Sequence, residues 1–227
     1  MKKPIIIAEA GVNHNGSLRI AKKLIDVAKK AKADYVKFQT FEANKLVTKQ
    51  AKLADYQKKN LKQNKSQYQM LKELELKKKD HIKLINYCKK KKIKFLSTAF
   101  DLESLEFLIK KCKIDCIKIP SGEITNLPLL EKAASLKKKI FLSTGMSNLK
   151  EISLAIKILN KNGCKSKNIT VLHCITNYPA APEELNLAVI KLLKKKFKIN
   201  VGYSDHSLGI LAPIIAVSYG ASVIEKH

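Results

Sequence analysis

The sequence predicts an α/β fold, a (β/α)8 barrel of parallel strands (TIM barrel). Short apolar runs of strand length recur along its 227 residues. Helical patterns, in which apolar residues return every three or four positions, separate most of these runs. Strands that alternate with helices at this spacing are typical of βαβ units and a parallel sheet. The runs number about eight, which is the number of strands that closes such a barrel.

An open doubly wound sheet is the competing α/β fold. Such a sheet usually carries a glycine-rich phosphate loop, G-x-G-x-x-G, directly after its first strand. Here the first apolar run continues into EAGVNHNGS, residues 9–17, which lacks that glycine spacing. The closed barrel is therefore the favoured fold.

The elements follow one another in a regular order. Helical patterns are clearest at 17–32, 79–92 and 126–138. The longest segment outside the alternation, about 42–79, is polar and rich in lysine and glutamine, so we expect an extended βα loop over the active face. No linker or repeat divides the chain, which predicts a single domain over residues 1–227. The expected strands are 4–11, 35–41, 94–100, 116–122, 139–145, 169–174, 199–206 and 222–227.

The net charge of +26 raises the question of a nucleic-acid partner. Arg19 is the only arginine, and the lysines are spread through every helical pattern without a basic stripe. Nucleic-acid readers favour arginine, because its guanidinium binds in a bidentate fashion and stacks on bases. We therefore interpret the lysines as solvated helix surfaces and expect no nucleic-acid partner, with a lysine-rich nucleic-acid binder as the alternative.

Other classes of protein are excluded by composition. No apolar run approaches the ~20 residues of a membrane span, and Glu9 interrupts the first run before a signal peptide could be complete. We expect a cytoplasmic protein with no membrane partner. The five cysteines contain no C-x-x-C pair, so buried free thiols are expected in place of disulfides or a structural zinc site.

Several polar residues mark the ends of expected strands, where a barrel builds its active site. Lys37 and Lys118 lie inside apolar strands, and burying a lysine is costly unless an anion compensates its charge. Each could instead extend to solvent or pair with a carboxylate. Thr98, Ser121 and Ser143 end neighbouring strands. Two cations and three hydroxyls predict a site for a phosphate or carboxylate ligand.

Two histidines end the seventh and eighth expected strands. Because successive strand side chains alternate between faces, Ser204 shares a face with His206, and Glu225 shares one with His227. Imidazoles on adjacent strand ends suit a divalent metal, although a single strand-end histidine is more often only hydrogen-bonded. We therefore predict a metal site at this pair. His81, at the start of a helical pattern, is expected on the surface.

Eight fragments of the sequence carry a family resemblance. They occur in chain order, one for each expected strand: IIAEAGVNHNGS, VKFQTF, FLSTAFD, KIPSGE, LSTGM, HCITNYPA, GYSDHS and GASVIEKH. From about residue 4 to residue 227 the chain closely resembles the sialic acid synthase family. That family comprises bacterial N-acetylneuraminate synthases and their legionaminate and pseudaminate relatives.

The resemblance implies a metal-dependent transferase that forms a carbon–carbon bond. Its members condense phosphoenolpyruvate with an N-acetylated hexosamine, such as N-acetylmannosamine, to give a nonulosonic acid such as N-acetylneuraminate and phosphate. The implied cofactor is Mn²⁺ or Mg²⁺, held by His206 and His227, and Glu9 is implicated in handling the water. The implied sugar contacts are Gln39, Glu123 and Tyr178. The implied phosphoenolpyruvate contacts are Lys37, Thr98, Lys118, Ser121, Ser143 and Ser204.

The family pattern extends beyond the barrel. Its members continue with a last helix and a C-terminal antifreeze-like domain, whose arginine reaches the partner subunit's site in a homodimer. The resemblance here stops at His227, so neither is expected in this sequence. Without that helix, Val223 and the run at 5–7 are expected to be poorly shielded. Two alternatives to a neuraminate synthase stay open: a legionaminate- or pseudaminate-type synthase, and an incomplete barrel that binds ligand without turnover.

Overall fold

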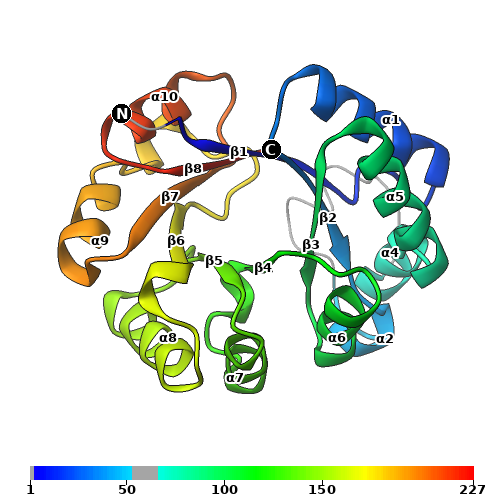
Figure 1. The fold of residues 1–227 in the computed structure, drawn as a ribbon, viewed down its shortest axis with the longest axis horizontal. Helices are drawn as coiled ribbons and strands as arrows, with labels where there is room; N and C mark the ends of the chain where they lie inside the picture. The colour runs from blue at the N-terminus through cyan, green and yellow to red at the C-terminus, as the bar shows by residue number, and fades with distance from the viewer. Residues whose placement is uncertain (1–2, 53–65) are drawn as a thin grey trace.

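The computed structural model describes residues 3–52 and 66–227. Within these residues, strands β1 to β8 are parallel and pair in chain order, and β8 pairs with β1 to close a barrel. Figure 1 shows this ring of strands with helices around it. The predicted (β/α)8 barrel is confirmed. The strands are β1 (Ile5–Gly11), β2 (Tyr35–Thr40), β3 (Lys94–Ala99), β4 (Cys116–Ile119), β5 (Lys139–Ser143), β6 (Ile169–Cys174), β7 (Asn200–Asp205) and β8 (Val223–Lys226).

Most helices begin at a polar residue and several end in lysines. The side chains of Ser17, Asp101 and Asn148 accept hydrogen bonds from backbone N–H groups in the first turns that follow them. The helices are α1 (Leu18–Lys30), α2 (Ala43–Leu46), α4 (Gln67–Leu74), α5 (Lys78–Lys91), α6 (Leu102–Lys110), α7 (Leu127–Ser135), α8 (Leu149–Lys161), α9 (Val189–Phe197) and α10 (Leu211–Ser218). Short 3₁₀ turns are η1 (Ser121–Glu123), η2 (Ser166–Asn168) and η3 (Pro182–Glu184).

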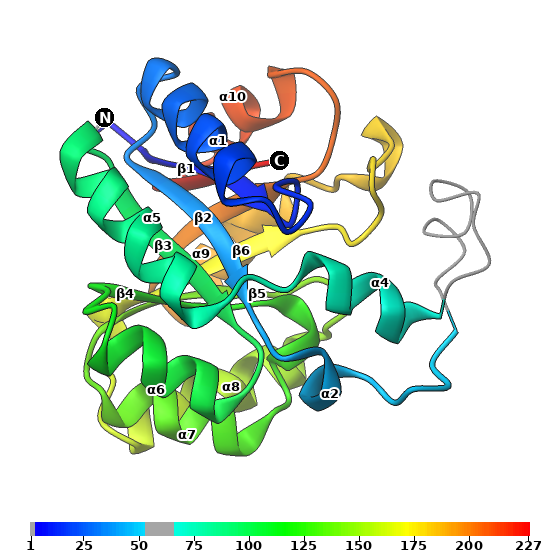
Figure 2. The same ribbon diagram turned by 90° about the vertical axis from the view of Figure 1, so that its right-hand side faces the viewer.

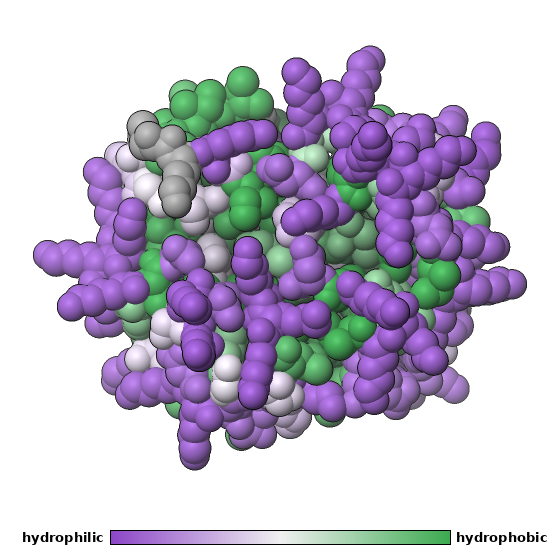
Figure 3. Space-filling model, in the orientation of Figure 1, coloured by the Kyte–Doolittle hydropathy of each residue, from purple (hydrophilic) through white to green (hydrophobic). Residues whose placement is uncertain are grey.

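The lysines have a structural reason for their positions. They occupy the last turns of α1, α5 and α9, where a cation offsets the negative end of the helix dipole. Figure 3 shows hydrophilic side chains spread over the visible face of the molecule, which is the face seen in Figure 1. Among the described residues, no helix combines the length and apolar character that a membrane crossing requires.

The predicted loop at 42–79 contains helices in its described part. Figure 2 shows α2 and α4 on the side of the barrel toward which the strands point. Residues 53–65 of this segment lie outside the described residues. Gly16, in the β1–α1 loop, has a φ of +71°, and a Cβ added there would lie 2.5 Å from the carbonyl oxygen of Glu73 on α4. Only glycine permits this contact without strain between the loop and α4.

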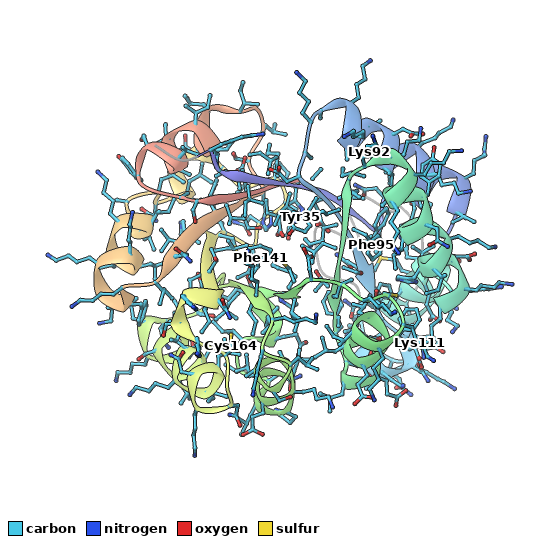
Figure 4. The ribbon with its side chains drawn as sticks, in the orientation of Figure 1. Tyr35, Lys92, Phe95, Lys111, Phe141 and Cys164 are labelled. Atoms are coloured by element: carbon cyan, nitrogen blue, oxygen red, sulfur yellow. The ribbon has the colours of Figure 1, made fainter. Side chains whose placement is uncertain are left out.

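The core has two layers. The larger layer packs the outer faces of the strands against the helices. Figure 4 shows Tyr35 and Phe141 toward the middle of the ring and Phe95 on the side of β3 that faces α5. The expectation that Val223 would be poorly shielded was wrong, because this side chain points into the barrel and is 2% exposed. The inner layer consists of Ile7, Tyr35, Leu96, Cys116, Phe141, Leu172 and Val223.

The prediction of a surface position for His81 was also wrong. Its side chain is 1% exposed, and Nε2 lies 2.8 Å from Thr40 Oγ1 at the end of β2. His14, in the β1–α1 loop, is fully buried, and its Nδ1 accepts a hydrogen bond from the Gly16 N–H. Both imidazoles belong to the interface between the strands and helix α5, which sequence spacing alone did not reveal.

His14 predicts a dependence of stability on pH. Burial, and then the nearby His81, lowers the pKa of His14 from 6.5 to about 4. The unfolded chain therefore binds more protons between these values, and stability present above pH 6.5 is lost as the pH falls toward 4. When the pH falls from about 7 to about 4.5, the free energy of unfolding of the parent should decrease by about 2 kcal/mol more than that of His14→Asn, which lacks the titrating imidazole. Urea unfolding across this range measures the difference, and parallel pH profiles would contradict the expectation.

Candidate active site

A cavity of about 360 Å³ lies at the C-terminal ends of the strands. Its wall contains all but one of the residues that the sequence predicted for the site. The exception is Glu123. The predicted residues on the wall are Glu9, Lys37, Gln39, Thr98, Lys118, Ser121, Ser143, Tyr178, Ser204, His206 and His227.

Strand alternation brings these side chains together. Every strand except β7 contributes a residue to the inner core layer, and the polar residues nearer the C-terminal ends of the strands lie above that layer. Glu9 on β1 is in register with Lys37 on β2, and Thr98 on β3 is in register with Lys118 on β4. Gly11 leaves room for the first of these pairs, because a Cβ there would lie 3.0 Å from Glu9 Oε1.

Two lysines and two carboxylates form a buried charge cluster. Lys37 Nζ lies 2.5 Å from Glu9 Oε2 and donates a hydrogen bond to Thr98 Oγ1 at 3.2 Å. Lys118 Nζ lies 2.6 Å from Glu225 Oε1. These lysine and glutamate side chains are at most 4% exposed. Glu225 was not assigned from the sequence, although its position two residues before His227 had placed it on the same face.

Burial and the neighbouring lysines have opposite effects on the pKa values of the two carboxyl groups in this cluster. Burial raises the pKa of Glu9 and outweighs the effect of Lys37. Burial also opposes ionisation of Glu225, but Lys118 and Lys37 outweigh it and hold its pKa well below the usual range. Glu225 is therefore a stable carboxylate. Glu9 is the carboxyl group in the cavity that is better suited to take up and release a proton.

His206 and His227 form a pair at the edge of the cavity, which we call the histidine pair. Their Nε2 atoms lie 3.1 Å apart, and the ring of Tyr178 stacks on His206 with centroids 3.9 Å apart. Nδ1 of His206 donates to the Ile175 carbonyl oxygen, which leaves a lone pair on its Nε2. Burial, and then His227, lowers the pKa of His206 to about 4, so its imidazole is neutral near pH 7.

The donor set fits a divalent cation. Ligand atoms of Glu9, Glu225 and His227 lie within 4.8 Å of one another. Glu9 Oε1 and Glu225 Oε2 are buried and have no hydrogen-bond partner within the described residues. Carboxylate oxygens and imidazole nitrogens are ligands that Mn²⁺ and Mg²⁺ accept. The structure therefore groups Glu9, Glu225 and His227 as possible ligands of such an ion, and a metal-binding role for His206, which this group does not include, stays a prediction.

Comparisons with known proteins decide the family. A sequence model of the NeuB family matches residues 24–227. The chain belongs to the NeuB family. The resemblance to sialic acid synthases is thereby confirmed.

Three relatives illustrate the similarity. The chain is 56% identical to N,N'-diacetyllegionaminic acid synthase of Campylobacter jejuni, covering 100% of this chain and 68% of the relative. It is 49% identical to the protein of the same name from Legionella pneumophila, covering 98% of this chain and 63% of the relative. The crystal structure of N-acetylneuraminic acid (sialic acid) synthetase from Leptospira borgpetersenii superposes with a TM-score of 0.86 at 37% identity, covering 100% of this chain and 73% of that one.

The NeuB-family barrel supports the histidine pair through residues that the sequence analysis missed. Asp205 is fully buried and accepts hydrogen bonds from Tyr203 Oη at 3.1 Å and from Ser207 Oγ at 2.6 Å. Lys226 Nζ lies 3.0 Å from the other oxygen of this carboxylate. These contacts join the ends of β7 and β8, which carry the histidines. The run Ser-Asp-His at the end of a buried strand was the available signal.

The predicted hydroxyl residues divide into two groups. Ser143 Oγ is buried and has no hydrogen-bond partner in the described part of the chain, so it is available to a ligand. Ser121 Oγ already accepts the Gly145 N–H at 3.0 Å and lies 3.1 Å from Cys174 Sγ. Ser204 Oγ donates to Glu225 Oε1 at 2.8 Å. A ligand must therefore compete for Ser121 and Ser204 but not for Ser143.

The predicted sugar contacts also differ in position. Gln39 and Tyr178 lie on the cavity wall of this NeuB-family chain. Glu123, in η1, accepts a hydrogen bond from Asn126 Nδ2 at 2.6 Å and is not on the wall. Asn126 caps helix α7, which gives Glu123 a structural partner. A role for Glu123 in sugar binding stays a prediction.

Proposed function

We propose that this NeuB-family barrel condenses phosphoenolpyruvate with an N-acetylated hexosamine to give a nonulosonic acid and phosphate. One observation carries the proposal: a single cavity combines two buried lysines, several hydroxyls and the histidine pair. The names of the similar proteins, which are synthases of nonulosonic acids, support the same reaction. The chain spans about two thirds of the length of the curated relatives, so the activity of the whole protein is part of the proposal.

Phosphoenolpyruvate suits the anion-binding part of the cavity. Its phosphate and carboxylate need several donors, and Lys37, Lys118 and Ser143 are buried around one space; the Ser143 hydroxyl has no hydrogen-bond partner among the described residues. Charge-assisted hydrogen bonds in a buried site are stronger than those in water. These residues bind and orient the substrate, and they stabilise the phosphate as it leaves.

The histidine pair, with Glu225 and Glu9, would hold Mn²⁺ or Mg²⁺ beside this anion site. A divalent cation bound there would supply Lewis-acid polarisation of the sugar aldehyde. The cavity keeps C3 of phosphoenolpyruvate next to the aldehyde carbon, and a new carbon–carbon bond forms between them.

Glu9 is the proposed acid–base residue. Bond formation at C3 breaks the π bond of the aldehyde, whose oxygen takes up a proton to become a hydroxyl, and leaves positive charge at C2. A water oxygen adds to C2 while Glu9 takes its proton. The bond between C2 and the phosphate oxygen then breaks as the C2 hydroxyl gives up its proton, so that the two protons of the water end on the new sugar hydroxyl and on the phosphate, and the keto acid is formed. Lys37, 2.5 Å from Glu9, steadies the carboxyl group in its ionised form.

Two acceptor sugars are candidates. N-acetylmannosamine is the acceptor that we inferred from the family resemblance. A hexosamine with two acetamido groups is the second, and it is favoured by the higher identity to the two N,N'-diacetyllegionaminic acid synthases than to the sialic acid synthetase. We further propose a cytoplasmic homodimer, because phosphoenolpyruvate is a cytoplasmic metabolite and the family resemblance implies two subunits.

Phosphate release tests the proposed function. The purified protein is incubated with Mn²⁺, phosphoenolpyruvate and either sugar, and phosphate and the mass of the keto acid are measured. Release that requires both substrates and stops with EDTA is expected. Salt-dependent DNA binding without any response to phosphoenolpyruvate would instead favour the alternative of a lysine-rich nucleic-acid binder.

Lys37→Ala is expected to weaken phosphoenolpyruvate binding by about 1–3 kcal/mol, the usual contribution of a charge-assisted hydrogen bond. Titration calorimetry in the presence of Mn²⁺ measures the change. Lys83→Ala is a matched control, because its exposed ammonium group pairs with Asp80 on the surface of α5. Equal affinity in the parent and in Lys37→Ala would remove Lys37 from the anion site.

A further inference from the structure

The Glu225 carboxylate occupies the centre of the proposed phosphoenolpyruvate donors. Its Oε1 accepts hydrogen bonds from Lys118 Nζ at 2.6 Å and from Ser204 Oγ at 2.8 Å. Its Oε2 lies 3.7 Å from Lys37 Nζ. The proposed function assigns Lys118, Ser204 and Lys37 to the substrate. In the structure these three residues thus contact, or lie close to, the carboxylate of Glu225.

The same carboxylate also borders the metal side of the cavity. Glu225 Oε1 lies 3.7 Å from Nε2 of His227, and the two residues are part of the group whose ligand atoms are within 4.8 Å of one another. Oε2 has no hydrogen-bond partner among the described residues. Glu225 therefore lies between the lysine side and the histidine side of the cavity.

Charge repulsion requires Glu225 to move when an anion binds to the same donors. Inside the protein, Lys37 and Lys118 are paired with Glu9 and Glu225, on side chains that are at most 4% exposed. Phosphoenolpyruvate brings a phosphate and a carboxylate into this cluster. Like charges at contact distance repel strongly in a buried site, so the substrate and Glu225 cannot share the same donors.

We propose that Glu225 is a movable internal anion that couples the two halves of the site. Phosphoenolpyruvate takes its place at Lys118 and Ser204, and the displaced carboxylate turns to the histidine pair, where it favours a divalent cation. This inference rests on the proposed function. Because coupling between two ligands is reciprocal, phosphoenolpyruvate and the cation must each strengthen binding of the other.

Calorimetric titration of phosphoenolpyruvate, in EDTA and in saturating Mn²⁺, tests the inference. For the parent protein we expect affinity to be at least about fivefold higher with Mn²⁺, the lower end of typical couplings. Glu225→Gln keeps the shape of the side chain but removes its charge. In EDTA it should bind phosphoenolpyruvate about tenfold more tightly than the parent, because the internal competitor has been neutralised. In this variant, Mn²⁺ should raise the affinity for phosphoenolpyruvate by less than about twofold.

A control variant outside the cavity separates displacement from a general change of charge. Glu106→Gln removes a surface carboxylate that also has two lysine partners, at 3.0 and 2.7 Å, and should match the parent.

The outcomes distinguish this inference from the proposed function. If the parent binds no phosphoenolpyruvate, the proposed function fails. If the parent binds it but Glu225→Gln matches the parent with and without Mn²⁺, only the displacement fails. If circular dichroism shows that Glu225→Gln does not fold, the test uses the parent protein alone. Phosphoenolpyruvate must then raise the affinity for Mn²⁺ by the same factor by which Mn²⁺ raises the affinity for phosphoenolpyruvate. Independent binding of the two ligands would overturn the coupling.

Discussion

Lys118→Ala is expected to lower the free energy of unfolding by about 3 kcal/mol, the cost of leaving a buried carboxylate without its partner. Lys118 is the nearest cation to Glu225, at 2.6 Å, and both side chains are at most 4% exposed. Lys37 is the other lysine near this carboxylate, at 3.7 Å, and it already pairs with Glu9. Urea unfolding at neutral pH, followed by circular dichroism, measures the loss.

A double variant isolates the cause. In Lys118→Ala/Glu225→Gln no unpaired carboxylate is buried, so much of the lost stability should return, as a positive coupling in the double-mutant cycle. Lys110→Ala is a surface control, since its pair with Glu106 is exposed and should contribute less than about 1 kcal/mol. If Lys118→Ala and Lys110→Ala are equally stable, Lys118 does not compensate the Glu225 charge.

His206→Ala is expected to reduce Mn²⁺ affinity by at least about a hundredfold, the upper end of the effect known for residues that merely support a metal ligand. The change removes one of the two imidazole nitrogens that lie 3.1 Å apart. The barrel itself should stay folded, because residues at the C-terminal face of such barrels serve function more than stability. Titration with Mn²⁺, monitored by electron paramagnetic resonance, provides the affinity.

His173→Ala is the matched control for the metal site. His173 lies on β6, is 6% exposed, and its Nε2 contacts the Leu185 carbonyl oxygen at 2.7 Å. Losing it should reduce stability and leave Mn²⁺ affinity unchanged. If both variants bind Mn²⁺ as the parent does, the histidine pair is structural.

The barrel and much of its cavity could be predicted from local patterns. A strand of period two places Lys37 and Gln39 on one face, and the fold class places the C-terminal ends of all strands around one opening. Once the strands were recognised, Lys118 and Ser143 necessarily converged with them. This information lies within six or seven consecutive residues, so it does not depend on knowing distant contacts.

The contacts within the cavity depended on partners far apart in the chain. Glu225 and Lys118 are separated by 107 residues. No local pattern shows that the Glu225 carboxylate pairs with Lys118 and not with a histidine. His81 was misplaced for the same reason, since its burial requires α5 to turn that face toward Thr40. Glu123 follows a strand as the lining residues do, yet the turn at η1 directs it to Asn126. Strand alternation is set by the backbone of each strand, whereas pairing of charges is set by the packing of the whole barrel, and only the closed structure decides it.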